Sequence, residues 1–115
     1  MSRNNILHVR TPRDSSASAN KQNTGNDFDY DLSNGRIPQD QEAHGVRGEP
    51  IYVPGDGYDP ATGTGRFQLA SDSPGVGAGQ ALPNFSDAST GKAPDIGAHQ
   101  RGAPAMQYGV RAHQP

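Results

Sequence analysis

The chain contains neither cysteine nor tryptophan, and it has few of the residues that usually fill a protein core. Without cysteine, disulfide bonds and cysteine-based zinc sites are excluded. Ile, Leu, Val and Phe together account for 16 of the 115 residues, about 14%, which is below the ~20% under which disorder becomes an option. The formal net charge is only −2, so the strong charge typical of disordered chains is missing. We therefore expect one small, marginally stable domain that depends on a neighbour.

Long apolar runs are also missing. No stretch of about 18 apolar residues occurs, so the sequence predicts no membrane span. Residues 1–14 lack the apolar region of a secretory signal peptide. Charges of both signs are scattered rather than gathered into a basic patch, which argues against nucleic-acid binding.

Glycine and proline are abundant, with 15 and 10 copies. After Ala70 they recur often enough to interrupt both helices and strand ladders. The sequence therefore predicts an irregular Gly/Pro-rich tail over residues 70–115 and no long helix anywhere in the chain.

Four short segments have the composition of strands. Residues 4–9 form an apolar run after two asparagines, and residues 27–32 alternate strictly between Asp and an apolar residue. Residues 51–53 and 66–69 are shorter examples.

Two polar segments separate these strands. Residues 13–25 are almost purely small or polar, which predicts a mobile loop. Residues 55–65 are rich in turn-forming types, which predicts a surface loop.

The second half of the chain carries three motifs in a fixed order: FQL at 67–69, SPGVGAG at 73–79 and PDIGAH at 94–99. Together with the EAHG…EPIYV element at 42–53, they resemble the C-terminal end of bacterial right-handed parallel β-helix proteins of the pectate-lyase-like type. In that family, motifs of the form "SPAIDAG" and "PDIGAxE" follow the last strands. The resemblance covers roughly residues 22–112.

This resemblance implies an all-β fold made of the last coil or coils of a β-helix over residues 1–69, closed by an irregular cap over residues 70–115. It implies a non-catalytic terminal module of an extracellular or cell-surface protein that binds or acts on polysaccharide. The expected partners are upstream coils or other copies of the chain. Two alternatives stay open: a structural protein that self-associates through open β edges, and a fragment of a polysaccharide lyase. Fold alone does not choose between them.

Two positions depart from the family pattern. Gly77 stands where the family has Asp, so a side chain that could fix the turn is missing there. Gln100 stands where Glu is usual, and His99 precedes it, which predicts a weaker charge pair at this point.

Candidate binding residues are few. Asp27, Asp29 and Asp31 lie on one face of the predicted strand and could bind calcium, although a solvated strand face explains them more simply. No other cofactor is indicated. Tyrosines could serve as stacking platforms for a carbohydrate, or as packing residues: Tyr52, Tyr58 and Tyr108.

A possible acid–base group also occurs. Glu42, His44 and Arg47 combine a base, a proton carrier and a cation, which is the set that a polysaccharide lyase needs. In the family, this element is structural, and no catalytic residue is predicted in the chain.

Overall fold

The fold is described from a computed structural model of the 115-residue chain. It describes residues 1–19, 22, 25–87, 89 and 93–104. Over these ranges the chain has no helix, and its strands form two small sheets, so the expected β-type, non-helical character is confirmed. The strands are β1 (Ile6–Leu7), β2 (Leu32–Ser33), β3 (Val46–Arg47), β4 (Gly57–Asp59) and β5 (Thr64–Arg66).

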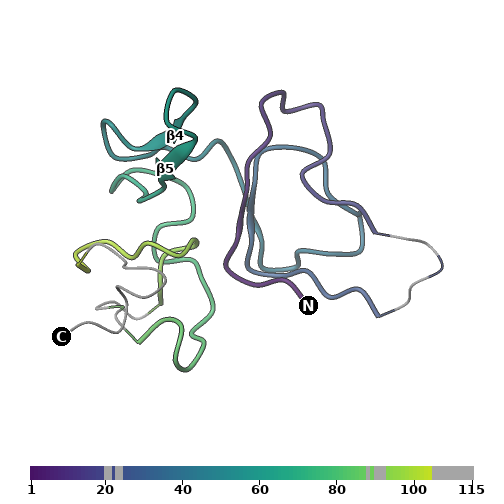
Figure 1. Ribbon diagram of the computed structural model, residues 1–115. Helices are drawn as coiled ribbons and strands as arrows, with labels where there is room; N and C mark the ends of the chain where they lie inside the picture. Colours follow the sequence, from purple (N-terminus) through teal and green to yellow (C-terminus); the bar gives the residue numbers. More distant parts are fainter. Residues whose placement is uncertain (20–21, 23–24, 88, 90–92, 105–115) are drawn as a thin grey trace.

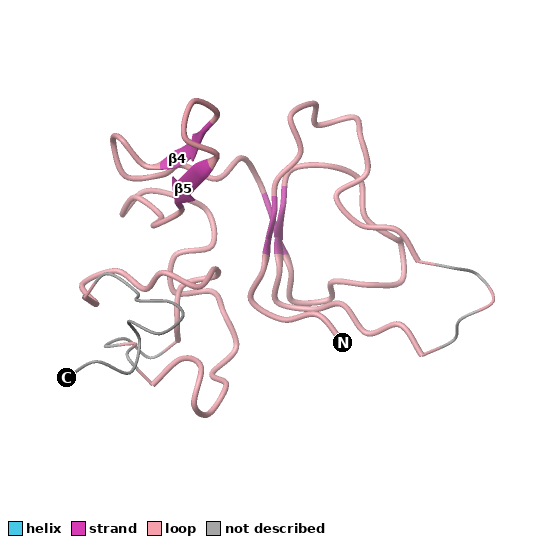
Figure 2. Ribbon diagram, viewed as in Figure 1, coloured by secondary structure: helices cyan, strands magenta, loops and turns pink. Residues whose placement is uncertain are grey.

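The first sheet is parallel, and its strands lie side by side in chain order, β1-β2-β3. Ile6 pairs with Leu32, and Leu32 pairs with Val46. Figure 2 shows the connecting loops extending to one side of this sheet, while the chain after β3 turns to the other side. Successive parallel strands need such long connections, because the chain must return to the end of the sheet at which the previous strand began.

Strands β1 and β2 are shorter than the expected segments, and β3 was not expected; a left-handed residue precedes each of the three. Asn4, Tyr30 and Glu42 have φ values of 58°, 59° and 63°. Asparagine tolerates this conformation, whereas tyrosine and glutamate rarely adopt it. The expected strand over 27–32 is therefore reduced to β2 and one isolated bridge, between Ser2 and Phe28.

The expected surface loop at 55–65 is instead a β-hairpin, visible at the upper left of Figure 1. Strands β4 and β5 pair in antiparallel fashion around a turn in which Gly63 has a φ of 67°. Asp59 fixes the turn, since its carboxylate accepts hydrogen bonds from the Ala61 amide at 2.9 Å and the Thr62 hydroxyl at 3.0 Å. The turn-rich composition correctly indicated a reversal of the chain, but glycine-rich flanks hid the strands.

The segments at 51–53 and 66–69 meet at a single antiparallel bridge, between Tyr52 and Leu69. The Val53 amide donates to the Gln68 carbonyl at 2.9 Å, and the Ala70 amide donates to the Ile51 carbonyl at 2.8 Å. Both predicted strands therefore pair, the first at Tyr52 alone and the second at Leu69 and at Arg66, which belongs to β5.

The hydrophobic core is small and lies between the parallel sheet and the tail. Its fully buried members are Leu32, Leu69 and Ile96. Gly75 lies among them at a φ of 89°, and a Cβ atom there would come within 3.1 Å of a Leu32 methyl group. The tail can approach the sheet this closely because residue 75 has no side chain. Partly buried apolar residues surround this centre: Ile6, Val46, Tyr52, Val76 and Ala78.

The opposite face of the parallel sheet is polar. Because side chains alternate along a strand, Asp31 and Ser33 point away from the core that Leu32 enters. Both are nevertheless buried. Part of the segment expected as a mobile loop pairs with the second connection, through a bridge between Ser15 and Arg36. The expected solvated face for Asp31 is therefore wrong, since its exposed fraction is 0%.

The turn at Gly77 does have a side chain that fixes it. The Gly77 amide donates to Oδ1 of Asp95 at 2.8 Å, and Arg101 donates to Oδ2 of the same carboxylate from its backbone at 3.1 Å and from Nε at 2.9 Å. Burial alone would raise the pKa of Asp95, but the hydrogen bonds from Arg101 and Gly77 outweigh it and lower that pKa. A carboxylate 18 residues away thus replaces the one that the turn lacks.

Candidate functional site

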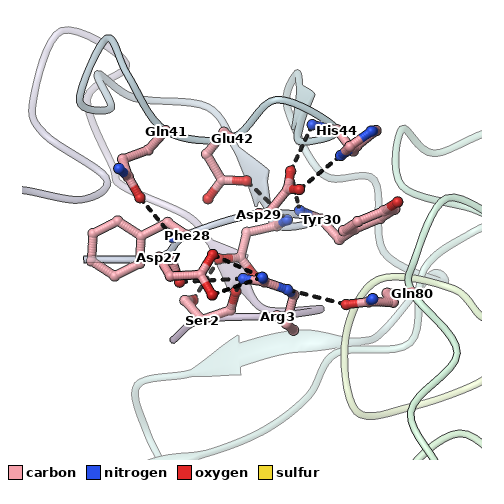
Figure 3. A network of polar contacts seen from close by, with 11 residues as sticks. Ser2, Arg3, Asp27, Phe28, Asp29, Tyr30, Gln41, Glu42, His44 and Gln80 are labelled. Carbon is pink, nitrogen blue, oxygen red and sulfur yellow. Dashed lines mark hydrogen bonds and ion pairs between the residues drawn. The ribbon is translucent and has the colours of Figure 1, made fainter. Parts of the chain in front are cut away.

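A network of polar side chains gathers where the parallel strands begin (Figure 3). Arg3 lies at one end of it. Its guanidinium binds both carboxylate oxygens of Asp27, at 2.8 and 2.9 Å, and donates to Oε1 of Gln80 at 3.1 Å. Arg3 therefore links the loop before β2 to the C-terminal tail. Its hydrogen bond to Asp27 raises the pKa of the guanidinium above its ordinary value.

Asn4 makes a second link to the tail. Its side-chain amide donates to the Gln80 carbonyl at 2.7 Å and accepts from the Gln80 amide at 2.8 Å. We call this arrangement a two-point amide contact, because one side-chain amide satisfies both backbone groups of one residue. The Asn4 carbonyl also accepts from the Gly97 amide at 2.8 Å. Asn4 thus binds two separate parts of the tail, Gln80 through its side chain and Gly97 through its backbone carbonyl.

Asp29, Tyr30 and His44 form the middle of the network. Asp29 accepts hydrogen bonds from the backbone amide of His44 at 2.6 Å and from its Nδ1 at 2.7 Å. The rings of Tyr30 and His44 stack with centroids 4.7 Å apart. Burial alone would raise the pKa of Asp29, but the hydrogen bonds from His44 and Tyr30 outweigh it and lower that pKa.

The buried Asp31 and the half-buried Glu42 form the innermost part of the network. Asp31 accepts a short hydrogen bond from the Ser2 hydroxyl and further bonds from the backbone amide and side chain of Asn5, at 2.8 and 3.2 Å. Glu42 reaches the same place, because its Oε2 accepts from the Asp31 amide at 3.1 Å. Burial raises the pKa of Glu42 to about 7, and the nearby Asp31 contributes to the increase.

The three aspartates suggested as a calcium site each have separate partners. Asp27 binds Arg3, Asp29 binds His44, and Asp31 binds Ser2 and Asn5. Within the described part of the chain, no group of three or more His, Asp or Glu side chains is arranged to hold a metal ion. The strand spacing placed these carboxylates correctly near one another, but it could not show which donors surround each one.

The suggested acid–base group is also divided between different partners. Glu42 faces Asp31, and His44 binds Asp29. Arg47 turns to the other connection, where it donates to the Gly35 carbonyl at 2.8 Å. The three side chains therefore do not converge on a common point.

Two of the three tyrosines suggested as stacking platforms can be described, and they have different environments. Tyr52 is half-buried beside the core, packs edge-on against Phe67 with ring centroids 5.6 Å apart, and its hydroxyl lies 3.3 Å from Nδ1 of His8. Burial raises the pKa of Tyr52. Tyr58 lies on β4 with 66% of its surface exposed. Tyr108 lies outside the described residues.

A surface cluster at the other end of the parallel strands was not expected from the sequence. Asn34 makes a two-point amide contact with Val9, at 2.8 and 2.7 Å, and donates to Oε2 of Glu49 at 2.9 Å. Oε1 of Glu49 lies 2.8 Å from Nε2 of His8. The hydrogen bonds from Asn34 and His8 lower the pKa of Glu49. The sequence signal was present, because these residues follow β1, β2 and β3 in turn, but only the register of the sheet brings them together.

Comparison with known proteins gives no match to a family model, to a curated protein or to a solved structure. Among the described residues, no helix has the length and apolar character required to cross a membrane. The geometry of the sheet and of its polar network therefore carries the functional argument.

Proposed function

We propose that this chain is a non-catalytic terminal module that caps an extracellular right-handed β-helix protein, one whose other coils bind or act on polysaccharide. The observation that carries the proposal is the stacking of β1, β2 and β3 in chain order as a parallel sheet. In a solenoid, each unit contacts only its neighbours, and a terminal unit must cover the exposed end. A preceding coil would therefore add beside β1.

The two edges of the parallel sheet differ in a way that supports this direction. Over the described residues, neither β1 nor β3 pairs with a further strand on its outer side. Strand β1 consists of Ile6 and Leu7, which suit pairing with another strand. Strand β3 contains the exposed Arg47, and Pro50 follows shortly after. Charged residues and prolines at an edge discourage pairing.

Covering of one sheet face by the tail supports the same proposal. Leu69 and Ile96 close the apolar face over Leu32, and Asn4 and Arg3 fasten the tail at Gln80. A segment that closes an end would need such fixed attachments. The motif resemblance to β-helix termini supplies the expected identity of the preceding coils, and polysaccharide enters only through that resemblance.

Self-association is the second candidate function, and the open outer side of β1 favours it too. A cap has one edge suited to pairing, so association should stop at two chains. A filament-forming protein needs two such edges, so assembly should continue as concentration rises.

Light scattering across a wide concentration range, combined with far-ultraviolet circular dichroism, distinguishes the two. We expect a β-type spectrum and a mass that reaches a limit at one or two chains. Growth beyond two chains would contradict the capping role and support self-association. Turnover of any polysaccharide by the isolated chain would contradict its non-catalytic character.

A further inference from the structure

The carboxyl pair of Asp31, which is buried, and Glu42, which is half-buried, has an unusual set of neighbours. Asp31 is completely buried, and its oxygen atoms accept from the Ser2 hydroxyl and from Asn5. All of these donors are neutral. These donors replace part of the hydration that the Asp31 carboxylate loses on burial.

Glu42 lacks such support. Its Oε2 accepts one hydrogen bond, from the Asp31 amide. Its Oε1 is the only buried side-chain oxygen or nitrogen without a hydrogen-bond partner among the described residues. The side chain is also held in place, because its atoms pack against Gly45 and the backbone of Glu42 is left-handed. An ionised Glu42 would therefore leave a buried negative oxygen unpaired beside a second carboxylate.

The surrounding charged groups compensate for this only in part, since Arg3 attracts the Asp31 carboxylate electrostatically but forms its ion pair with Asp27. Asp29 adds a further negative charge near Glu42. The cations of the network are committed elsewhere, since Arg3 binds Asp27 and His44 binds Asp29. Over the described part of the chain, no Lys, Arg or His forms an ion pair with Asp31 or Glu42.

We infer that Glu42 carries a proton in the folded chain and that Asp31 and Glu42 act as a pH-sensitive lock on the start of the parallel strands. Asp31 directly precedes β2, and Glu42 lies in the connection that leads into β3. Loss of the proton from Glu42 places two negative charges in one buried site and weakens the contact between these two segments. This inference concerns the stability of the fold and does not depend on the capping role.

The direction of the pH effect follows from proton linkage. The pKa of Glu42 rises from 4.5 to about 7 on folding, so the folded chain holds a proton that the unfolded chain releases. The stabilisation is complete below pH 4.5 and is lost as the pH rises to about 7. The pKa values of Asp29 and Asp95 are lowered in the folded chain, so these groups have the opposite pH dependence. The stability that they contribute is lost only in more acidic solution. Histidine side chains ordinarily change charge in the same interval as Glu42, so the contribution of Glu42 is isolated by comparison with a variant that cannot ionise at position 42.

Denaturant unfolding of the wild type and of Glu42→Gln, at intervals from about pH 5 to pH 8, tests the inference. Glutamine keeps the acceptor for the Asp31 amide but cannot ionise. We expect the folding equilibrium constant of the wild type to fall by about tenfold to a hundredfold more than that of Glu42→Gln over this range. Asp40→Asn, which changes an exposed carboxylate, should follow the wild type. Equal pH dependence of Glu42→Gln and the wild type would overturn the inference.

A second measurement does not require the variant to fold. The carboxyl carbon resonance of Glu42 in the wild type, followed by NMR during a pH titration, should change with a midpoint near 7. A midpoint below about 5, close to the ordinary value for glutamate, would show that Glu42 is ionised in the neutral fold and would overturn the inference.

Discussion

The stacked strands before residue 49 differ from the part of the chain after it, which comprises the hairpin and the tail, in the residues that they use to turn. Both must reverse direction often, yet among the described residues all seven left-handed glycines lie at position 55 or later. Three of the four left-handed residues that are not glycine lie at position 42 or earlier: Asn4, Tyr30 and Glu42. The first region thus places side chains at its strained positions, and the second region leaves them bare.

This difference has a structural consequence. Each of the three side chains at the strained positions of the first region takes part in the polar network, with Asn4 binding Gln80, Tyr30 stacking on His44, and Glu42 binding the Asp31 amide. In the tail, the absence of a side chain permits close approach instead, as at Gly75. The first region uses strained residues to make contacts, whereas in the tail Gly75 and Gly97 let the backbone come close to the sheet residues Leu32 and Ile6.

The two regions share one hydrophobic core, to which both contribute side chains. Leu32 comes from the sheet, Leu69 from the segment directly before the tail, and Ile96 from the tail. A chain with so few large apolar residues cannot build a core in each region, because burial of each side chain contributes only about 1.5–3 kcal/mol. We therefore expect both regions to unfold together.

Truncation of a side chain in the shared core should have the largest effect on the free energy of unfolding. Leu32→Ala removes a completely buried side chain and should lower the free energy of unfolding by about 3–4 kcal/mol, as for other leucines at buried sites. Leu69→Ala should cost a similar amount. Thermal unfolding followed by circular dichroism should show one transition at a lower temperature for both variants.

Phe85→Ala provides the control, since this ring is 86% exposed and its loss should cost less than about 0.5 kcal/mol. If Leu69→Ala melted the tail while the amides of β2 kept their protection from hydrogen exchange, the two regions would be independent and the comparison would fail.

Replacement of Asn4 should have the next largest effect. Two different replacements separate the contribution of its side-chain hydrogen bonds from the cost of its left-handed backbone. Asn4→Ala removes both amide hydrogen bonds to Gln80 and places alanine at a φ of 58°. Asn4→Gly removes the same bonds but tolerates the backbone. We expect losses of about 3 and 2 kcal/mol in the free energy of unfolding, measured with denaturant, and the difference of about 1 kcal/mol is the cost of the backbone alone. Equal losses would mean that the strained backbone contributes nothing.

The sequence predicted local features better than long-range ones. The strands around residues 6 and 32 follow from residue type and alternation, as does the absence of a long helix over the described residues. The hairpin at 57–66 was missed because glycine and threonine give it no apolar alternation. Contacts such as the one between Asn4 and Gln80 join residues 76 positions apart, and no local pattern specifies them.

The candidate site was predictable to the same degree. Alternation placed Asp27, Asp29 and Asp31 near one another, but it predicted a solvated face for all three. The burial of Asp31 depends on the fold of connections that are themselves irregular. Glu42 was noticed as a possible base, while its true neighbour, Asp31, became visible only from the register of the sheet.

The smallest expected effect concerns Gln100, at the position where the resembling family has glutamate. Its side chain makes a two-point amide contact with Asp95, accepting from the backbone amide at 2.7 Å and donating to the carbonyl at 2.9 Å, and it also donates to the Gly97 carbonyl at 3.0 Å. Gln100→Glu keeps the acceptor but loses both donors and adds a charge near the buried Asp95 carboxylate.

We expect Gln100→Glu to lower the free energy of unfolding by about 1 kcal/mol at neutral pH, measured with denaturant. The loss should shrink in acid as the new carboxyl group gains a proton and becomes a donor. Gln39→Glu makes the same chemical change at an exposed position and should have almost no effect. A variant as stable as the wild type would show that the tail tolerates the family residue, and that its attachment depends on Asp95 and Arg101 rather than on the amide.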